Sequence, residues 1–397
     1  MNATRRVWRA TLLLMIGCLT LGSCEGDPGR DATPGPPEPE DVVDALAPEL
    51  DSGEEVDTPE PPAPPEPVVT PLLESARISS QPGSPNFHRV SAPFFLDATP
   101  YASVRLQVEL GTTCYPFTSW RREDIPEGHR WPSHCDAFDR NFEILLRQVD
   151  APEDQPLFEV ERAITPFGGP MSLEVDITDL ANARPGAWEL IVHISTWSDG
   201  GGQVTGSDGG WNIDAGLHVA VGPPPRPVLD VLPLHNGNLT RDEPRALVRW
   251  TNPEEVRSVR LEYRTTGHGG GADPGNCLGP AEEFCRRFHA LYVDGRALAT
   301  LRPWREDCEA LCTLLPFPGQ PGSSYCAENP TGAIPSVRAP RANWCPGDVT
   351  PPFVWEDEVL ALPGERSVEV EISHIAPGGS WRTSLLVYLY GEAPLRP

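Results

Sequence analysis

The stretch Ser103-Val-Arg-Leu-Gln-Val-Glu-Leu110 decides the fold, because apolar and polar side chains alternate along its whole length. A period of two places the Val and Leu side chains on one face of a β-strand, where they can pack on a core. No segment of the chain keeps a helical period over three turns. Similar strand-like runs follow at 142–146, 157–164, 173–177, 188–194, 211–221, 246–250, 258–263, 289–293, 367–373 and 384–390. The sequence therefore predicts an all-β protein.

The chain length and the positions of Pro and Gly indicate how these strands are divided between domains. The chain has 397 residues, enough for two domains that each bury a core. Its 48 Pro and 36 Gly disfavour long helices and favour short strands joined by turns. The segment Val221-Gly-Pro-Pro-Pro-Arg-Pro227 interrupts the alternation and indicates a hinge. We predict two jelly-roll (β-sandwich) domains packed side by side, residues 73–222 and 229–397, joined by the hinge 223–228.

The first residues have the features of an export signal. Three arginines precede the apolar run 10–21, which is too short to span a bilayer. The run ends in Leu21-Gly-Ser-Cys24, which resembles a bacterial lipobox. We therefore predict a lipoprotein signal peptide at 1–23 and lipidation of Cys24. This makes the protein an exported bacterial lipoprotein of the cell envelope, at the outer membrane or cell surface, with membrane contact through the anchor only. An ordinary cleaved signal is the alternative.

The charge of the chain is concentrated in one segment. Residues 25–70 carry fourteen Asp or Glu and one Arg, and they contain almost no large apolar side chains. Such a segment cannot bury enough surface to offset the entropy of ordering, so we predict a disordered, acidic, Pro-rich tether at 24–72. The net charge of −26 excludes nucleic acid as a partner, because phosphate binding needs a basic surface.

The cysteine count agrees with export. With Cys18 lost in the signal and Cys24 lipidated, eight cysteines remain, at 114, 135, 277, 285, 308, 312, 326 and 345. An even number in an exported protein favours four disulfides, whose pairing the residues alone leave open. A zinc site is the competing interpretation, with His129, His134, Cys114 and Cys135 as ligands. Oxidised cysteines cannot ligate metal, so export disfavours it.

Short motifs in both predicted domains resemble the peptide-N-glycosidase F family. Cys135-Asp-Ala-Phe-Asp-Arg140 differs from the family pattern only in Phe138, where the family has Trp. Each motif alone is weak evidence. Together the motifs occur in the same order as in the family, and the resemblance spans residues 73–397 apart from insertions. The others are Ile164-Thr-Pro-Phe167, Glu174-Val-Asp-Ile-Thr-Asp179, Thr196-Trp197, Gly267-His268, Glu283-Phe-Cys285 and Arg341-Ala-Asn-Trp-Cys-Pro-Gly347.

The resemblance implies two jelly rolls with an active site at their interface. It implies an amidase that hydrolyses the bond between asparagine and the first N-acetylglucosamine of an N-glycan, without metal or other cofactor. Asp139 falls on the aspartate that activates water, and Glu283 on the second essential carboxylate. Two carboxylates in different environments can share the proton transfers of amide hydrolysis. The implied substrate-binding residues are Phe138, Arg140, Ser195, Trp197, His268, Arg341 and Trp344.

Structural roles are the alternative for these residues. Asp139 could pair only with Arg140, the tryptophans could belong to a core, and Glu283 could be a solvated acid. The sequence also departs from the family: Ser195 replaces a third carboxylate and Thr266 replaces a tryptophan. A serine carries no charge, so substrate positioning or proton handling must differ. The loop between Cys114 and Cys135 is longer than its family counterpart.

The family pattern also suggests the disulfides. It pairs Cys114 with Cys135, Cys277 with Cys285, and Cys326 with Cys345, which leaves Cys308 and Cys312 to close a local loop. These four pairs are our prediction.

The sequence is compatible with three functions. The first is a surface-anchored, monomeric amidase acting on N-linked glycoproteins or glycopeptides. The second is a catalytically weak or inactive glycan-binding lipoprotein of the same fold, suggested by Ser195. The third is a copper monooxygenase of related architecture. That class needs paired histidines and a methionine ligand, whereas this chain has no His-His or His-x-His and only Met171 outside the signal.

Overall fold

The computed structural model describes residues 68–81, 83–112, 114, 127, 135–196, 209–271, 277–317 and 320–392. The described residues form one compact unit. The predicted signal peptide, Cys24 and the tether up to residue 67 lie outside them. Within the described ranges, no helix has the length and apolar character needed to cross a bilayer.

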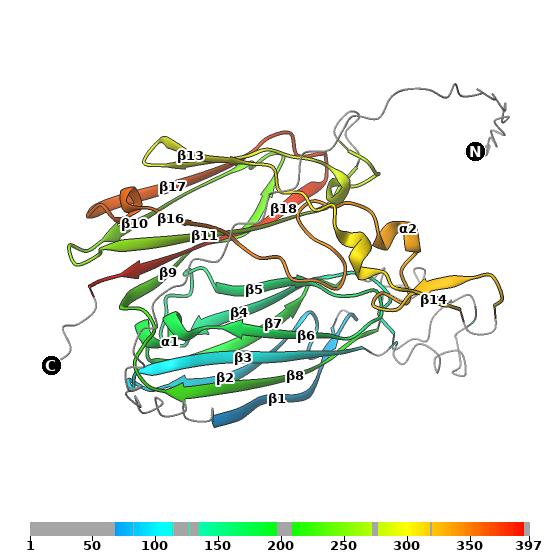
Figure 1. The fold of residues 1–397 in the computed structure, drawn as a ribbon, viewed down its shortest axis with the longest axis horizontal. Helices are drawn as coiled ribbons and strands as arrows, with labels where there is room; N and C mark the ends of the chain where they lie inside the picture. The colour runs from blue at the N-terminus through cyan, green and yellow to red at the C-terminus, as the bar shows by residue number, and fades with distance from the viewer. Residues whose placement is uncertain are drawn as a thin grey trace, which may run out of the picture. The chain divides into compact units, whose positions relative to one another are not determined.

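Antiparallel strands are the main regular elements of this unit (Figure 1). The first group is β1 (Val68–Ser79), β2 (Arg89–Leu96), β3 (Tyr101–Thr112), β4 (Asn141–Gln148), β5 (Phe158–Ile164), β6 (Met171–Asp176), β7 (Gly186–Ile194) and β8 (Gly210–Val221). The second group is β9 (Val228–Thr240), β10 (Arg245–Asn252), β11 (Ser258–Gly269), β12 (His289–Val293), β13 (Arg296–Leu301), β16 (Phe353–Glu356), β17 (Gly364–Ile372) and β18 (Gly379–Tyr390).

Both groups have the same topology. The first forms sheets of order β1-β8-β3-β6 and β2-β7-β4-β5. The second forms β16-β11-β18-β9 and β10-β17-β12-β13. When the eight strands of each group are counted in chain order, both groups have one sheet with strands 1, 8, 3 and 6 and another with 2, 7, 4 and 5. The eight strands of each group thus pair as in a jelly roll, which confirms the predicted all-β, double jelly-roll fold.

Each jelly roll has its own apolar core. The alternating stretch 103–110 lies in β3, where Val104, Leu106, Val108 and Leu110 are almost completely buried. They pack with the apolar faces of the other first-group strands, including Trp188 and Trp211. Leu261, Tyr263, Val368 and Leu385 belong to the second core. The period of two therefore places the buried residues as predicted.

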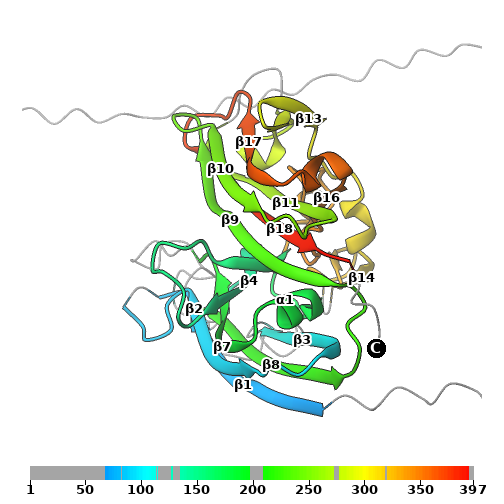
Figure 2. The same cartoon turned by 90° about the vertical axis from the view of Figure 1, so that its left-hand side faces the viewer.

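Small elements connect the strands. They are α1 (Thr178–Ala183), α2 (Ile334–Val337), the 3-10 turns η2 (Glu282–Phe284), η3 (Cys308–Leu311) and η4 (Glu358–Ala361), and the short hairpin β14 (Leu314–Pro316) and β15 (Ser324–Cys326). The helix α1 contacts both β3 and β9, so it packs between strands of the two groups (Figure 2).

Several strands differ from the sequence-based prediction: β1 begins earlier than expected, and β2, β9, β13 and β16 were not predicted. Residues 68–72 were assigned to the tether, but β1 already begins at Val68 and pairs with β8. The strand β9 was not predicted, because Pro233 and Gly237 interrupt its alternation. It pairs with β18 alone, and the register shifts where Pro233 and His235 face β18. Proline has no N–H to donate to a neighbouring strand. An irregular position in an edge strand tolerates it, because an edge strand is hydrogen-bonded on one side only.

The two groups meet through buried charged side chains. Arg162 of β5 is fully buried, and its Nε and Nη2 donate to Glu159 over 2.5 and 2.6 Å. Its Nη1 donates to the carbonyl of Arg382 in β18 over 2.6 Å. Arg382 Nε in turn donates to Glu143 of β4 over 2.5 Å. The pairing of these charges depends on both jelly rolls. The interface also has an apolar part, because Val231, Leu386, Tyr388 and Tyr390 of the second jelly roll pack into the first core.

Candidate active site

The segment Cys135-Asp-Ala-Phe-Asp-Arg140 leads into β4 and is held from three sides. The Cys114–Cys135 disulfide ties it to the end of β3. Asp136 is fully buried and accepts hydrogen bonds from Ser80 Oγ at 2.7 Å and from Arg140 Nε and Nη2 at 3.3 Å each. Gly209 lies against the peptide between Cys135 and Asp136, where a Cβ would come within 2.1 Å of the Cys135 carbonyl carbon. These contacts fix the backbone that carries Asp139.

This arrangement gives Arg140 a structural partner. The sequence offered Arg140 as the cation beside Asp139 or as a substrate-binding group. In the structure it is 8% exposed and forms its ion pair with Asp136, for which the sequence suggested no role. Its guanidinium also lies 5.1 Å from the centre of the Phe138 ring. Arg140 and Asp136 therefore stabilise the segment on which Asp139 stands.

Arg341 brings the two predicted catalytic carboxylates together. Its Nη1 donates to Glu283 Oε1 over 2.8 Å, and its Nη2 lies 3.5 Å from Asp139 Oδ2. The Arg341 side chain is 1% exposed, whereas those of Asp139 and Glu283 are 16% and 26% exposed. A buried cation thus faces two partly exposed carboxylates that are far apart in the sequence. The alternative in which Asp139 pairs only with Arg140 does not hold.

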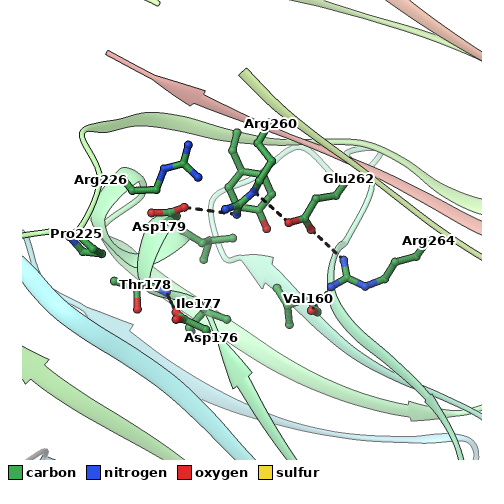
Figure 3. A pocket seen from close by; sticks show the side chains of 12 residues that line it. Val160, Asp176, Ile177, Thr178, Asp179, Pro225, Arg226, Arg260, Glu262 and Arg264 are labelled. Carbon is green, nitrogen blue, oxygen red and sulfur yellow. Dashed lines mark hydrogen bonds and ion pairs between the residues drawn. The ribbon is translucent and has the colours of Figure 1, made fainter. Parts of the chain in front are cut away.

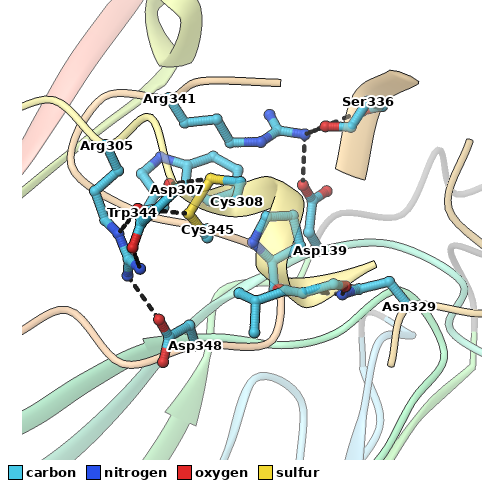
Figure 4. Close-up of a disulfide and its surroundings, with 12 residues drawn as sticks. Asp139, Arg305, Asp307, Cys308, Asn329, Ser336, Arg341, Trp344, Cys345 and Asp348 are labelled. Carbon is cyan, nitrogen blue, oxygen red and sulfur yellow. Dashed lines mark hydrogen bonds and ion pairs between the residues drawn. A yellow bond between two sulfur atoms is a disulfide. The ribbon is translucent and has the colours of Figure 1, made fainter. Parts of the chain in front are cut away.

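The backbone around Arg341 explains its fixed position. Arg341 and Arg305 exchange two backbone hydrogen bonds, and the amide of Ala342 donates to the carbonyl of Glu283 over 2.7 Å. Arg341 Nη2 also donates to the carbonyl and the Oγ of Ser336, at 2.9 and 3.0 Å. Figure 4 shows Arg341 extending between Ser336 and Asp139. Ser336 belongs to none of the recognised motifs, so sequence reasoning missed it.

Of the two neighbouring acids Glu282 and Glu283, only Glu283 reaches Arg341. Glu282 is fully buried and pairs with Arg287 at 2.8 and 2.9 Å. It also accepts from Trp381 Nε1 and from the amide of Ala376. Its hydrogen-bonding capacity is therefore used by the core, and Glu283 is the member of the pair that can meet a ligand.

Both candidate catalytic carboxyls titrate above their usual range. Burial raises the pKa of Asp139 and outweighs the opposing charge of Arg341. Burial also raises the pKa of Glu283, again against Arg341, and the nearby charge of Asp139 raises it further. A carboxylate with a raised pKa is a stronger base at neutral pH, which suits proton transfer to or from water.

Trp344 and His268 form the adjoining wall. The Trp344 ring lies 4.4 Å below the Arg341 guanidinium, and its Nε1 donates to the carbonyl of Gly267. The His268 ring stacks on Trp344 with 5.5 Å between centroids. Gly267 is required here, because a Cβ would approach Ala342 Cβ to 2.8 Å. Trp344 is 2% exposed, so it supports Arg341 and His268 and presents little surface for sugar stacking.

The remaining predicted residues are only partly defined. Ser195 follows β7, is exposed, and its amide donates to the carbonyl of Asn141. Phe138 is half-buried beside Asp139. Trp197 lies outside the described residues, as do most of the loop after Cys114 and both histidines of the zinc alternative. Cys114 and Cys135 are bonded to each other, which removes them as zinc ligands.

Two of the four predicted disulfides are wrong. Cys114–Cys135 and Cys277–Cys285 are present as predicted. The other two are Cys308–Cys345 and Cys312–Cys326, not Cys308–Cys312 and Cys326–Cys345. Cys308, in η3, is fully buried next to the carbonyl of Trp344. Cys312 meets Cys326 because the β14–β15 hairpin folds back beside it.

A separate pocket of about 340 Å³ lies between the jelly rolls near Pro225 (Figure 3). Its charged groups pair mainly with one another. Arg260 lies 3.4 Å from Asp179 and 3.1 Å from Glu262, and Arg264 lies 3.2 Å from Glu262. None of the predicted site residues lines it. We therefore place the candidate active site at Arg341 and not in this pocket.

Comparison with known proteins agrees with the fold. Residues 237–390 match the family described as Peptide-N-glycosidase F, C terminal. The structure of PNGF-II is 18% identical, with a TM-score of 0.61, and the match covers 83% of this chain and 66%, just under two thirds, of that chain. PNGase F, a glycosylasparaginase from Flavobacterium meningosepticum, is 16% identical, with a TM-score of 0.59 and coverage of 84% and 98%.

A further structure, titled peptide-N(4)-(N-acetyl-β-D-glucosaminyl) asparagine amidase, is 15% identical, with a TM-score of 0.57 and coverage of 83% and 98%. No curated protein matches the chain. At these identities the likeness to solved structures concerns the fold. The family match covers residues 237–390, so the second jelly roll is similar in sequence to the C-terminal part of the peptide-N-glycosidase F family, and the whole described unit shares the fold of these solved structures.

Proposed function

We propose that the protein hydrolyses the amide bond between asparagine and N-acetylglucosamine in N-linked glycoproteins or glycopeptides. The observation that carries this proposal is the convergence of Asp139 and Glu283 on Arg341. The two acids come from different jelly rolls, and Arg341 joins them in one partly exposed group. This is the residue set that the family resemblance assigns to amide hydrolysis.

The geometry supports a division of roles. Asp139 falls on the family's water-activating aspartate and has a raised pKa, which makes its ionised form a stronger base than an ordinary aspartate; it takes a proton from water as the water attacks the side-chain carbonyl of asparagine. One of the two carboxyls, in its protonated form, returns a proton to the departing glycosylamine nitrogen. The Asp139–Glu283 pair therefore ends with the same number of protons as it had at the start. The positive charge of the Arg341 guanidinium limits the repulsion between the two carboxylates. The products are an aspartate side chain and a glycosylamine, which then loses ammonia.

The direct test uses a denatured N-glycoprotein incubated with the purified protein. Cleavage is detected as loss of glycan mass and as aspartate in place of asparagine at the glycosylation site. We expect Asp139→Asn and Glu283→Gln each to lower turnover by roughly a hundredfold or more, the usual effect of removing a positioned acid–base group.

Glu282→Gln is the matched contrast variant, because Glu282 adjoins Glu283 but bonds to Arg287 and the core. It should lower the melting temperature and leave the turnover of the folded fraction near the wild-type value. Wild-type-like turnover in either Asp139→Asn or Glu283→Gln would remove that residue from the mechanism.

A glycan-binding protein that cleaves poorly is the second candidate, and Ser195 favours it. This exposed residue supplies no charge where the family has a carboxylate. The two candidates are separated by measuring cleavage and glycan-array binding on one preparation. Retention of glycopeptides without any release of glycan would support binding alone. If Ser195→Glu then raises cleavage, the serine accounts for the weak activity.

We also propose that Cys24 carries a lipid and anchors a monomeric protein at the bacterial cell envelope through the tether. The support is the lipobox-like Leu21-Gly-Ser-Cys24 and the acidic segment that follows it. Cys24→Ser should move the protein from the membrane fraction to the soluble fraction. Incorporation of labelled fatty acid into this variant at the wild-type level would contradict the assignment.

A further inference from the structure

Thr266 and His268 lie on the same side of β11, because side chains two residues apart in a strand point to the same face. Thr266 is fully buried, and His268 is half-buried. Thr266 Oγ1 lies 3.2 Å from Arg162 Nη1 and 2.8 Å from His268 Nε2. Arg162, Thr266 and His268 therefore form a continuous chain of hydrogen bonds that leads from the interface between the jelly rolls to the wall of the candidate active site.

The direction of these bonds follows from the hydrogens available. An arginine can only donate, so Thr266 Oγ1 accepts from Arg162. The hydroxyl has one hydrogen of its own, and a buried hydroxyl that donates to nothing is costly. Within the described part of the chain, His268 Nε2 is the one acceptor bonded to this hydroxyl. The hydrogen of Thr266 therefore goes to Nε2.

This direction determines the tautomer of His268. If Nε2 accepts a hydrogen bond, a neutral imidazole must carry its proton on Nδ1. Burial and the neighbouring charge of Arg162 lower the pKa of His268 to about 3, which keeps the ring neutral at physiological pH. Arg162 is itself held by Glu159 and the carbonyl of Arg382, so it cannot turn away from Thr266 without breaking those bonds.

We propose that Thr266 is a positioning residue that fixes His268 as the Nδ1–H tautomer, so that His268 donates a hydrogen bond to a ligand oxygen and does not act as a proton acceptor. Nδ1 makes no hydrogen bond within the described residues, which leaves its hydrogen for a ligand. The suitable acceptors on a glycosylated asparagine are the side-chain carbonyl and the N-acetyl carbonyl. This second part rests on the proposed function, whereas the tautomer does not.

The tautomer can be measured without any substrate. Long-range proton–nitrogen NMR spectra of the full-length protein labelled with nitrogen-15 histidine distinguish protonated from unprotonated ring nitrogens. The His268 signals are identified by their absence in His268→Gln. We expect Nδ1–H with unprotonated Nε2 across the neutral pH range. A proton on Nε2 in the wild-type protein would overturn the proposal.

The role of Thr266 is tested with two variants at that position and one control. Thr266→Val has the same shape without the hydroxyl and should shift His268 towards the Nε2–H tautomer. Thr266→Ser keeps the hydroxyl and should restore Nδ1–H. Thr265→Val removes a buried hydroxyl from the opposite face of β11 and should leave the tautomer unchanged. An unchanged tautomer in folded Thr266→Val would show that Thr266 does not position His268.

The ligand contact is tested through glycopeptide kinetics and binding. Thr266→Val should lower kcat/KM by about tenfold, the effect of one lost hydrogen bond, and Thr266→Ser should recover it. If the wild-type protein shows the Nδ1–H tautomer but cleaves no glycopeptide, the proposed function fails and the tautomer assignment stands. In that case the affinity of Thr266→Val and Thr266→Ser for the glycopeptide is measured in place of kcat/KM. Equal affinity of these two variants would exclude His268 as a donor to the ligand.

Discussion

Arg341 sets the charge balance of the candidate active site. One guanidinium faces two carboxylates, so the ionisation of both acids leaves the group with an excess negative charge. Both carboxylates are partly buried, and this burial raises the pKa of Asp139 and of Glu283. Residues that perform catalysis are commonly held in such unfavourable environments.

The first prediction concerns stability and pH. Because the pKa of Asp139 is higher in the folded than in the unfolded state, the folded state binds the proton more tightly. Stability therefore falls as the pH rises from the unfolded pKa through the folded one. We expect Asp139→Asn to have a higher melting temperature than the wild-type protein at neutral pH. This difference should disappear at a pH below the ordinary range of aspartate.

Asp307→Asn is the control for this prediction. A hydrogen bond from Arg305 lowers the pKa of Asp307, so its ionised form stabilises the folded state. The Asp307 side chain is 65% exposed, and its replacement should cause a small loss of stability at neutral pH. Thermal melts across a pH series measure both variants, and a lower melting temperature for Asp139→Asn at neutral pH would refute the prediction.

Motif resemblance located the residues that the proposed chemistry needs, because the motifs occur in a fixed order along the chain. It located Asp139, Glu283 and Arg341, which the structure brings together. It could not find Ser336 or the contact from Arg162 to Thr266, since these depend on which strands pack against each other. From the sequence, Arg140 was expected to pair with Asp139, because residues adjacent in sequence were assumed to be in contact in space. The bond to buried Asp136 depends on the path of the backbone between them.

At the scale of elements, the cysteine-rich connection between β13 and β16 is where sequence reasoning failed. The spacing of Cys308 and Cys312 permits a local loop, but η3 buries Cys308 beside Trp344. The hairpin that follows brings Cys326 next to Cys312. Pairing in such a region depends on the tertiary fold of the loop, whereas the strands were predictable because their alternation is local.

The second prediction is the disulfide map. Cleavage on the carboxyl side of Arg and Glu separates Cys308, in segment 307–309, from Cys312 and Cys326, which stay together in segment 310–328. The structure predicts that 307–309 is linked to the segment that begins at residue 342 and contains Cys345, and that 310–328 holds an internal disulfide. Mass spectrometry under non-reducing conditions identifies these products. A covalent link between 307–309 and 310–328 would contradict the structure.

The third prediction concerns the function of these two disulfides. A double Cys308→Ser, Cys345→Ser variant should lose more activity than Cys312→Ser, Cys326→Ser, because Cys345 directly follows Trp344. In the chain-entropy description the two bonds contribute about 4 and about 3 kcal/mol for their loops. Similar melting temperatures with unequal activity would support this division. Equal activity losses in the two variants would argue against a special role for Cys308–Cys345.

For the whole molecule, the buried ion pairs between the jelly rolls matter more than the surface charges. Glu143 is 1% exposed and pairs with Arg382 from the other jelly roll. Although burial alone would raise it, the hydrogen bond from His193 and the charge of Arg382 lower the pKa of Glu143. The ionised form of Glu143 therefore stabilises the contact between the two jelly rolls. This stabilisation is lost as the pH falls below the usual range of glutamate.

The fourth prediction compares two glutamates of the same sheet. Glu143→Gln should lower the free energy of unfolding by about 3–5 kcal/mol, because it leaves Arg382 buried without its partner. Glu189 forms the equivalent pair with Arg147 at the surface, where the Arg147 side chain is 53% exposed. Glu189→Gln should change the free energy of unfolding by less than about 1 kcal/mol. Denaturant melts distinguish the two, and equal losses would mean that the contact between the jelly rolls does not depend on Glu143.

The position of the disulfides has a further consequence for the timing of activity. None of the eight paired cysteines belongs to either of the two large apolar cores. Burial of those cores can thus precede oxidation, whereas the loop that carries Arg341 is tied to Cys308 only afterwards. A newly made chain in a reducing compartment would then be folded but dormant. With the export and the amidase activity proposed above, passage into an oxidising compartment would complete it, and the cell that makes the protein would be shielded from its activity until then.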